Sequence, residues 1–250
     1  HIESYIRIDR RINVFDLGKG KITSAKHLFQ SRYKRLGIFI LYYLSAGKIK
    51  KYYARKISKM ILSERFTEAL IYATKLHASQ VRKGSGVPYI AHLLGVASIA
   101  LEYGANEAEA IASLLHDAVE DQGGAATREE IRRRFGDTVT AIVDGCTDAD
   151  TTPKPPWRQR KEAYIAHIPT ASPSVLLVSA ADKLHNARSI LRDYKILGES
   201  VWERFKGGKD GTLWYYRALV DAFRQASSMP IIDELDRVVS ELEIMVIGNG

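Results

Sequence analysis

Residues 114–121 read LLHDAVED and place one histidine and three acidic residues directly after two leucines. If this stretch is helical, His116 and Glu120 lie along one stripe and Asp117 and Asp121 along the next, because residues four apart share a helix face. Leaving so much charge unpaired against a segment that looks like core costs several kcal/mol or more. We therefore expect a partner that neutralises this charge, and a divalent metal ion is one candidate.

Successive helices are the dominant pattern of the chain after Ser63. Apolar residues recur at helical spacing, glycine and proline stand between the periodic stretches, and no stretch alternates with the period of a half-buried strand. The expected helices include SERFTEALIYATKLHASQ (63–80), IAHLLGVASIALEYG (90–104), NEAEAIASLLHDAVED (106–121) and SPSVLLVSAADKLHNARSILRDY (172–194). We expect an all-α fold, a compact helical bundle with a basic N-terminal helical extension.

The composition is that of a globular protein, with 46% hydrophobic and 26% charged residues in 250, which suits one large domain or one domain with a substantial extension. Cys146 is the only cysteine. An intramolecular disulfide and thiolate-rich metal sites are therefore excluded, and we expect a cytoplasmic protein. The formal charge of +8 divides into +12 for residues 1–60 and −4 for the remainder. The excess of lysine and arginine lies in an N-terminal arm, and no sequence-specific nucleic-acid binding is expected.

The most apolar part of this arm is LGIFILYYLSAG (36–47), which lies between clusters of lysine and arginine. It is shorter than the roughly 20 residues that a helix needs to span a bilayer. Two interpretations stay open. Residues 32–59 make a weak contact with a membrane surface or an anionic polymer, or they form a helix that packs on the domain with a solvated basic face. The chain begins at His1, which leaves open whether the native N-terminus is present, and its oligomeric state is open too.

Nitrogen and oxygen donors for a metal ion stand on three of the expected helices. His92 lies in YIAHLLGVA, His116 and Asp117 lie in SLLHDAVED, and Asp182 lies in LLVSAADKLHN. Two imidazoles and two carboxylates without sulfur suit Mn²⁺, Fe²⁺ or Zn²⁺. A single histidine on an apolar helix is more often a hydrogen-bonded core residue, but a carboxylate that follows a buried run requires a cation. The hypothesis requires both imidazoles to face Asp182 in one pocket.

Four motifs connect these donors to a known family. The chain carries HxxQ at 77–80, RKGSGVPYIAH at 82–92, LLHDAVED at 114–121 and AADKLHNARSI at 180–190. In this order and spacing they resemble the HD-domain metal-dependent phosphohydrolases, specifically the RelA/SpoT-type guanosine 3′,5′-bis(diphosphate) 3′-pyrophosphohydrolases and their small single-domain relatives. The resemblance covers about residues 63–225. The proline that usually follows the metal-binding histidine is Leu93 here.

The resemblance implies a division of the chain into three parts. These are the extension of uncertain role at 1–60, an HD phosphohydrolase domain at 61–226, and a C-terminal helix at 227–250 that packs on the domain. It also implies one divalent metal ion, usually Mn²⁺, bound by four side chains, which are His92, His116, Asp117 and Asp182. Glu120 and Asp121 match the acidic pair that activates water and handles protons. The alternative is an acidic pair in solvent, although carboxylates at a helix C-terminus oppose the macrodipole.

Five residues match positions that face the substrate in the family, namely Arg82, Lys83, Asn186, Arg188 and Ser189. The first two stand in the loop that contacts the nucleotide and its phosphates, and a solvated loop is the alternative for them. The last three match the side of the later helix that faces the ribose and phosphates. Asn186 and Ser189 follow Asp182 by four and seven residues, so these three side chains share one helical stripe.

The function that the resemblance implies is metal-dependent hydrolysis of ppGpp or pppGpp at the 3′ position, which releases pyrophosphate and GDP or GTP. One alternative keeps the metal site and changes the substrate to another nucleotide, such as NADPH, a nucleoside monophosphate or a cyclic dinucleotide. A second alternative is a non-catalytic HD domain that senses nucleotides. Every expected ligand and acid–base position is filled by a competent residue, which favours an enzyme.

Overall fold

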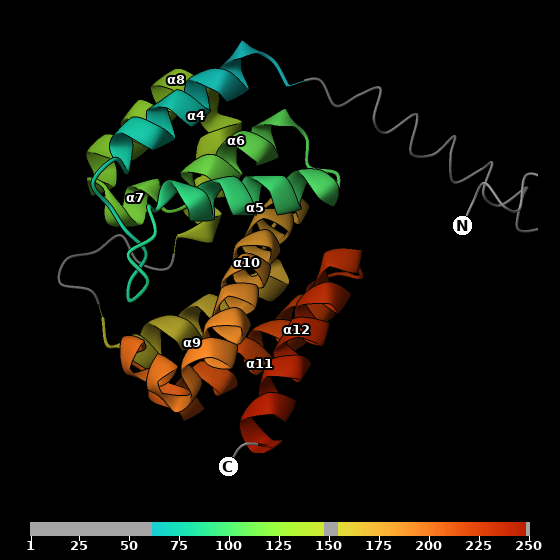
Figure 1. Cartoon of the computed structure of the whole chain (residues 1–250). Helices are drawn as coiled ribbons and strands as arrows, with labels where there is room; N and C mark the ends of the chain where they lie inside the picture. The colour runs from blue at the N-terminus through green and yellow to red at the C-terminus, as the bar shows by residue number, and fades with distance from the viewer. Residues whose placement is uncertain (1–61, 148–154, 249–250) are drawn as a thin grey trace, which may run out of the picture. The chain divides into compact units, whose positions relative to one another are not determined.

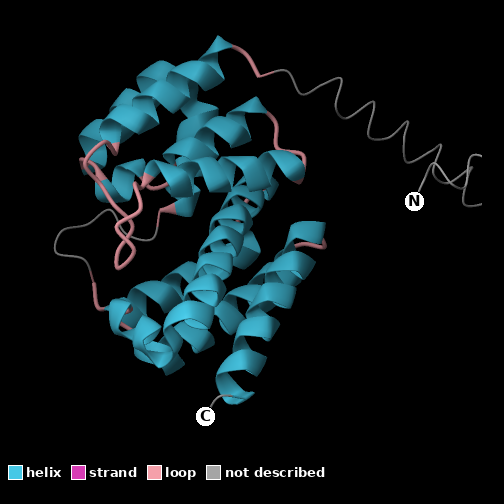
Figure 2. Cartoon of the chain, in the orientation of Figure 1, coloured by secondary structure: helices cyan, strands magenta, loops and turns pink. Residues whose placement is uncertain are grey.

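Helices joined by short loops make up the architecture of residues 62–147 and 155–248, which are the residues that the computed structural model describes (Figures 1 and 2). In these two ranges there is no β-strand, and Val81 and Pro88 form one isolated bridge. The expected all-α fold is confirmed. The predicted basic arm at 1–60, with its segment 32–59, lies outside the described residues. None of the helices in the described ranges is long and apolar enough to cross a membrane.

The helices follow one another along the chain with only brief interruptions. Their bounds are α4 (Glu64–Leu76), α5 (Ile90–Glu102), α6 (Glu107–Leu115), α7 (Ala118–Asp121), α8 (Gly124–Cys146), α9 (Trp157–His167), η2 (Ile168–Thr170), α10 (Pro173–Leu197), η3 (Gly198–Arg204), α11 (Gly208–Ala226) and α12 (Pro230–Gly248).

Local capping residues set where several of these helices begin. The Ser63 side chain accepts a hydrogen bond from the amide of Arg65 at the start of α4. Ser172 caps α10 in the same way and is followed by a proline in the first turn, where the missing N–H costs nothing. Asn106 and Glu109 form a reciprocal capping box at the start of α6. These side chains satisfy amides that have no partner inside the helix.

The segment around the HD pair differs from the single helix expected at 106–121. Helix α6 ends at Leu115, and α7 begins at Ala118, so His116 and Asp117 form the junction between two helices. The ring nitrogen Nδ1 of His116 lies 2.9 Å from the carbonyl oxygen of Ser113. In an uninterrupted helix that carbonyl would accept from the amide four residues later, so the side chain competes with the backbone at this point.

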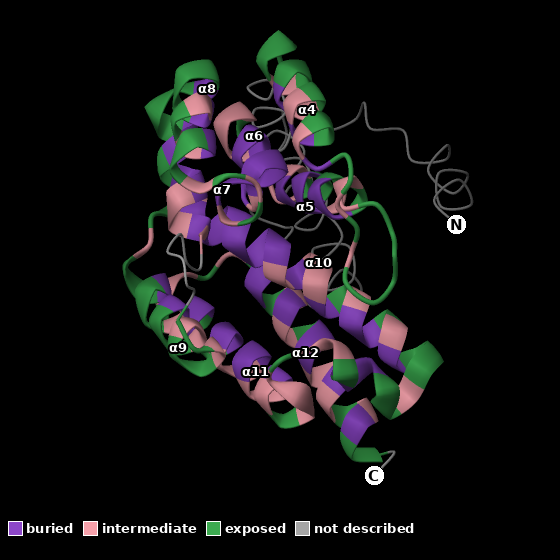
Figure 3. Cartoon of the chain, turned by 90° about the vertical axis from the view of Figure 1, so that its left-hand side faces the viewer, coloured by how far each residue is buried: buried purple, intermediate pink, exposed green. Residues whose placement is uncertain are grey.

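Two apolar clusters form the core, and α5 and α10 contribute to both. The first cluster joins α4, α6 and α8 and contains residues such as Ile111, Leu114 and Phe135. The second joins α9, α11 and α12 and contains residues such as Leu219 and Leu235. Figure 3 shows the buried residues of α10 running between these two groups of helices. Because α5 and α10 pack on each other as well, polar side chains at their crossing are held from both sides.

Helix α12 packs along α10 and α11. Its buried residues, including Ile231, Leu235 and Val239, belong to the same apolar cluster as α10 and α11. At the edge of this contact Arg188 on α10 pairs with Glu234 at 3.0 Å. The packing of α12 is thus continuous with the core of the described residues, although the proposed boundary at 226–227 stays a prediction.

Candidate metal centre and active site

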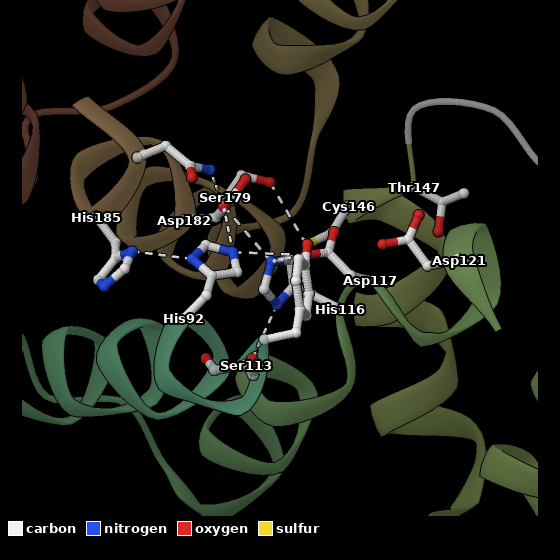
Figure 4. Close-up of polar contacts among 12 residues, drawn as sticks. His92, Ser113, His116, Asp117, Asp121, Cys146, Thr147, Ser179, Asp182 and His185 are labelled. Atoms are coloured by element: carbon white, nitrogen blue, oxygen red, sulfur yellow. Dashed lines mark hydrogen bonds and ion pairs between the residues drawn. The ribbon is translucent and has the colours of Figure 1, made fainter. Parts of the chain in front are cut away.

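The four predicted donors come from three places in the fold. His92 lies in the first turn of α5, His116 and Asp117 form the α6–α7 junction, and Asp182 lies near the middle of α10. Figure 4 shows the two imidazoles and the two carboxylates pointing toward one another. Both histidines and Asp182 are buried, whereas Asp117 is partly exposed. The packing of α5 and α6 against α10 therefore brings together side chains that are 90 residues apart in sequence.

The distances between the donor atoms are short. Nε2 of His92 lies 3.2 Å from Oδ1 of Asp182 and 3.5 Å from Oδ2 of Asp117. Nε2 of His116 lies 3.1 Å from Oδ2 of Asp117 and 3.5 Å from Oδ1 of Asp182. One ligand atom each from His92, His116 and Asp117 fits within 4.8 Å of the others. The condition that the imidazoles face Asp182 is met.

The hydrogen bonding of His116 fits a metal ligand. A carbonyl oxygen can only accept, so the contact of Nδ1 with Ser113 places the proton on Nδ1 and leaves a lone pair on Nε2. Nε2 is buried and has no hydrogen-bond partner, yet it faces two carboxylate oxygens. In the neutral ring this lone pair is directed at anionic oxygens, which is repulsive unless a proton or a metal ion lies between them, and the nitrogen and oxygen donor set suits a borderline or hard divalent ion.

Neighbouring charges keep the buried carboxylate of Asp182 ionised. Burial alone would raise its pKa, but Lys183, with Nζ at 2.7 Å, and the two imidazoles hold the pKa well below its usual value. Burial would lower the pKa of Lys183, and the charge of Asp182 raises it instead. Burial likewise opposes protonation of His116, but Asp117 and Asp182 raise its pKa. In the absence of an ion the site binds protons, which a metal would displace.

A network of hydrogen bonds joins this centre to the loop that precedes α5. Nδ2 of Asn186 donates to Oδ1 of Asp182 at 2.5 Å, and the guanidinium of Arg82 donates to Oδ1 of the same Asn186 at 2.7 Å. The hydroxyl of Tyr89 donates to Oδ2 of Asp117 at 2.6 Å. The loop thus contacts two of the four predicted ligands, one directly and one through an amide, although it is distant from both in sequence.

A cavity of about 520 Å³ opens beside the predicted ligands and includes His92 in its wall. This volume falls in the range of small-molecule sites, roughly 300–1,000 Å³. Its only acidic lining residue among those described is Asp193, whereas its cationic lining residues are Arg82, Lys83, Lys161, Lys183, Arg192, Arg204 and Lys206. A cavity with this charge is complementary to a ligand that carries several phosphates.

The structure brings four of the five predicted substrate residues to this cavity. Arg82, Lys83, Asn186 and Ser189 all line it. Arg188 does not, because its guanidinium points to α12 and pairs with Glu234. The geometry does not support the predicted contact of Arg188 with substrate.

The predicted acid–base pair lies beside the donor cluster and outside the cavity wall. Glu120 is partly buried, and Oε1 lies 3.9 Å from a guanidinium nitrogen of Arg160. Asp121 is exposed, accepts a hydrogen bond from Nε2 of Gln80 at 2.9 Å, and lies apart from the four donors in Figure 4. Its amide donates to the carbonyl of Asp117 at 3.0 Å. These carboxylates are positioned by the same short segment that supplies two predicted ligands.

Sequence reasoning missed several residues of this site. Tyr89 contacts a predicted ligand, and its place three residues before His92 in the RKGSGVPYIAH motif was the available signal. Arg192 lies on α10 and Arg204 lies at the end of η3, and both line the cavity although neither was among the predicted substrate residues. His185 contacts His92, and burial together with the nearby His92 and Arg82 lowers its pKa to about 4.

An all-helical bundle with a paired His–Asp motif and further donors from flanking helices defines the class of HD-domain proteins. The family model described as "HD domain" matches residues 69–213, and the chain belongs to this family. Among curated proteins, it is 42% identical over 128 residues to the guanosine-3′,5′-bis(diphosphate) 3′-pyrophosphohydrolase MESH1 of Xenopus tropicalis, covering 50% of this chain and 69% of that protein.

The chain is also similar to solved structures of comparable fold. A metazoan SpoT ortholog, described as hydrolysing ppGpp and acting in starvation responses, matches with a TM-score of 0.61 and 27% identity over 73% of this chain and 98% of that one. A protein from Listeria monocytogenes EGD-e matches with a TM-score of 0.55 and 34% identity over 60% of this chain and 97% of that one. The chain is therefore similar to RelA/SpoT-type hydrolases in both sequence and fold.

Proposed function

We propose that this protein hydrolyses guanosine 3′,5′-bis(diphosphate), ppGpp or pppGpp, at the 3′ position. The observation that carries the proposal is a cluster of two imidazoles and two carboxylates that opens into a cavity lined by seven cationic side chains. The name of its Xenopus relative describes this activity. Water attacks the phosphorus that is attached to O3′, the P–O3′ bond breaks, and pyrophosphate and GDP or GTP leave.

The substrate's charge explains the composition of the cavity. Two diphosphates carry several negative charges, and cations that neutralise them in a site shielded from water act more strongly than they would in bulk water. Arg82 and Lys83 enter from the loop before α5, and Lys183 enters from α10, so the cations surround the cavity from different sides. We assign the first two to the nucleotide and its phosphates, and Asn186 and Ser189 to the ribose side.

His92, His116, Asp117 and Asp182 are proposed to hold one divalent ion, and Mn²⁺ is the ion that the family resemblance favours. When bound, such an ion supplies an acidified water and neutralises phosphoryl charge. Glu120 and Asp121 are proposed to orient the attacking water and to accept its proton. The hydrogen bond from Gln80 to Asp121 supports this role because it fixes the direction of the carboxylate.

Two alternative functions remain as outcomes of the test. A different nucleotide, such as NADPH, a nucleoside monophosphate or a cyclic dinucleotide, would use the same centre without a 3′-diphosphate. A non-catalytic sensor would bind nucleotide without turnover. A cytoplasmic location is proposed from the single cysteine, which is buried and free.

The test is turnover of ppGpp by the full chain loaded with Mn²⁺, measured as pyrophosphate and GDP released in equal amounts. Asp182→Asn should lower kcat by roughly 10³-fold or more, since it removes a ligand charge and its contacts. Arg82→Ala should raise KM by roughly tenfold by removing a charge-assisted contact to phosphate, whereas Arg188→Ala should leave KM unchanged.

The result that would overturn the proposal is specific. Faster turnover of a nucleotide without a 3′-diphosphate would favour the alternative substrate, and an absence of turnover with every divalent ion tested would favour the sensor. If Arg188→Ala raised KM as much as Arg82→Ala, the cavity lined by Arg82 would not be the substrate site.

A further inference from the structure

We propose that His185 is a positioning residue for His92. It accepts a hydrogen bond from Nδ1 of that ring and so holds the Nε2 lone pair toward the metal centre. Gly95 is the residue that makes room for it. The inference rests on the metal centre of the proposed function and not on the identity of the nucleotide.

The two imidazoles of the centre are held by different kinds of partner. Nδ1 of His116 faces a backbone carbonyl, that of Ser113, at 2.9 Å. Nδ1 of His92 faces Nδ1 of His185, also at 2.9 Å, with ring centroids 4.8 Å apart and planes inclined by 58° (Figure 4). One ligand is therefore oriented by a fixed acceptor of the backbone, and the other by a side chain that substitution can remove.

The direction of this hydrogen bond follows from metal binding. A neutral imidazole has one N–H and one lone pair. Nε2 of His92 faces Asp182 and Asp117, so a metal at the centre needs the lone pair on Nε2 and the proton on Nδ1. Nδ1 must then donate, and the ring nitrogen of His185 is the acceptor within hydrogen-bond distance. Second partners of this kind fix the tautomer and orientation of metal-binding histidines.

Gly95 supplies an independent observation for the same contact. It lies three residues after His92, inside α5, where its φ is not in the left-handed region and nothing in the backbone requires glycine. A Cβ at this position would lie 2.3 Å from Cδ2 and 2.4 Å from Nε2 of His185. A helix with glycine in its interior is less stable than one with alanine there. The His185 ring occupies the space that an alanine Cβ would need, which explains the glycine at this position.

The hydroxyl of Ser189 donates to the backbone carbonyl of His185 at 2.9 Å, and this contact does not involve the His185 ring. A purely structural role for His185 would be to fill space between α5 and α10. The two roles predict different results for two substitutions. Asparagine keeps an acceptor close to the position of Nδ1 but fills less space than histidine, whereas leucine fills the space and has no acceptor.

The experiment measures the Kd for Mn²⁺ by titration calorimetry on the full chain, without nucleotide. His185→Leu should weaken binding by roughly 10–100-fold, as the loss of such a partner typically does, and His185→Asn should stay within roughly threefold of the wild type. Gly95→Ala should weaken binding as His185→Leu does, because it displaces the same ring. The double variant should be no weaker than His185→Leu alone, since both changes break one contact.

Gly145→Ala is the matched control for Gly95→Ala. It too adds a Cβ inside a helix against a side chain, 2.5 Å from Cγ2 of Val175, but this clash is apolar and does not involve a ring of the centre. It should lower Tm and leave the Kd for Mn²⁺ unchanged. Melting curves without metal identify any variant that does not fold. If His185→Leu does not fold, the comparison of Gly95→Ala with His185→Asn decides the question.

Equal affinity of His185→Leu and the wild type would overturn the inference, and so would an Asn variant as weak as the Leu variant, which would indicate packing alone. A wild type that binds no Mn²⁺ would overturn both the inference and the proposed metal centre. If the variants behave as expected but ppGpp is not hydrolysed, the proposed substrate fails and the inference stands.

Discussion

At the scale of single residues, two carboxylates of the HD segment, Asp117 and Asp121, each accept a hydrogen bond from a neutral side chain. The Tyr89 hydroxyl donates to Asp117, and the Gln80 amide donates to Asp121. His77 connects the two donors, because its ring stacks on Tyr89 with centroids 5.3 Å apart and its Nδ1 lies 2.6 Å from Oε1 of Gln80. The HxxQ motif thus orients the carboxylate of Asp121, the proposed acid–base residue, from outside the cavity.

Gln80→Leu tests this arrangement. The substitution removes the amide donor that orients the Asp121 carboxylate, so kcat for ppGpp should fall by roughly 10–100-fold, as is typical when a supporting hydrogen bond is lost. KM and the affinity for Mn²⁺ should stay unchanged, because the four donors of the centre are untouched. Steady-state kinetics and metal titration provide the two readouts.

Gln122→Leu is the control for this substitution. Gln122 donates to the same Oε1 of Gln80 at 2.6 Å and so contacts the acceptor end of the Gln80 amide, whereas Asp121 accepts from its donor end; kcat should therefore change by less than about threefold. If Gln80→Leu costs as much in an Asp121→Asn background as in the wild type, Gln80 does not act through Asp121.

At the scale of elements, the site depends on how the loop before α5 reaches across to η3 and α10. Gly84 has a φ of 82°, and a Cβ there would lie 2.3 Å from Cδ of Arg204. Arg204 in turn pairs with Asp193 at 2.7 Å. The loop that carries Arg82 is therefore seated against a cation of the cavity wall, and glycine permits both the turn and the close approach.

Gly84→Ala should weaken substrate binding through this contact. The substitution strains the backbone by about 1 kcal/mol at a positive φ, and it also displaces Arg204. We expect KM for ppGpp to rise by roughly five- to tenfold through the loss of a phosphate contact. Gly86→Ala is the matched control, since Gly86 has a φ of 69° with nothing within 4 Å of its added Cβ. A rise in KM that is equal in both variants would assign the effect to backbone strain alone.

At the scale of the whole molecule, α12 is attached to α10 by an apolar contact with ion pairs at its edge. Glu234 accepts from Arg237 on its own helix and from Arg188 on α10. Despite partial burial, the hydrogen bond from Arg237 and the contact with Arg188 lower the pKa of Glu234 to about 2. Arg188 thus contributes to the packing of α12.

Glu234→Gln should remove a pH-dependent part of the stability. Because the folded pKa lies below the unfolded value, the carboxylate stabilises the fold above about pH 4.5, and this contribution is lost as the pH falls through about 2. The pairs are solvent-exposed, so the loss at pH 7 should be about 1 kcal/mol or less. Urea unfolding at pH 7 and near pH 2.5 should show the difference shrinking at the lower pH. A difference that is constant with pH would contradict this account.

The sequence predicted the helical class and the four converging donors, because these depend on apolar periodicity and on motif residues. It did not predict the break at His116–Asp117, which arises from a ring nitrogen competing for the Ser113 carbonyl. Motif matching also did not predict that Arg188 pairs with Glu234 on α12. Arg188 follows Asp182 by six residues, which is a rotation of about 240° around the helix. It therefore lies on a different face of α10 from Asp182 and Asn186.

The measurement that tests the central claim most directly is the anomalous diffraction of Mn²⁺ in crystals of the full chain. The account predicts a peak at roughly 2.0–2.3 Å from Nε2 of His92, Nε2 of His116 and the carboxylates of Asp117 and Asp182. A peak bound elsewhere, or a centre in which either imidazole turns away from the ion, would contradict it.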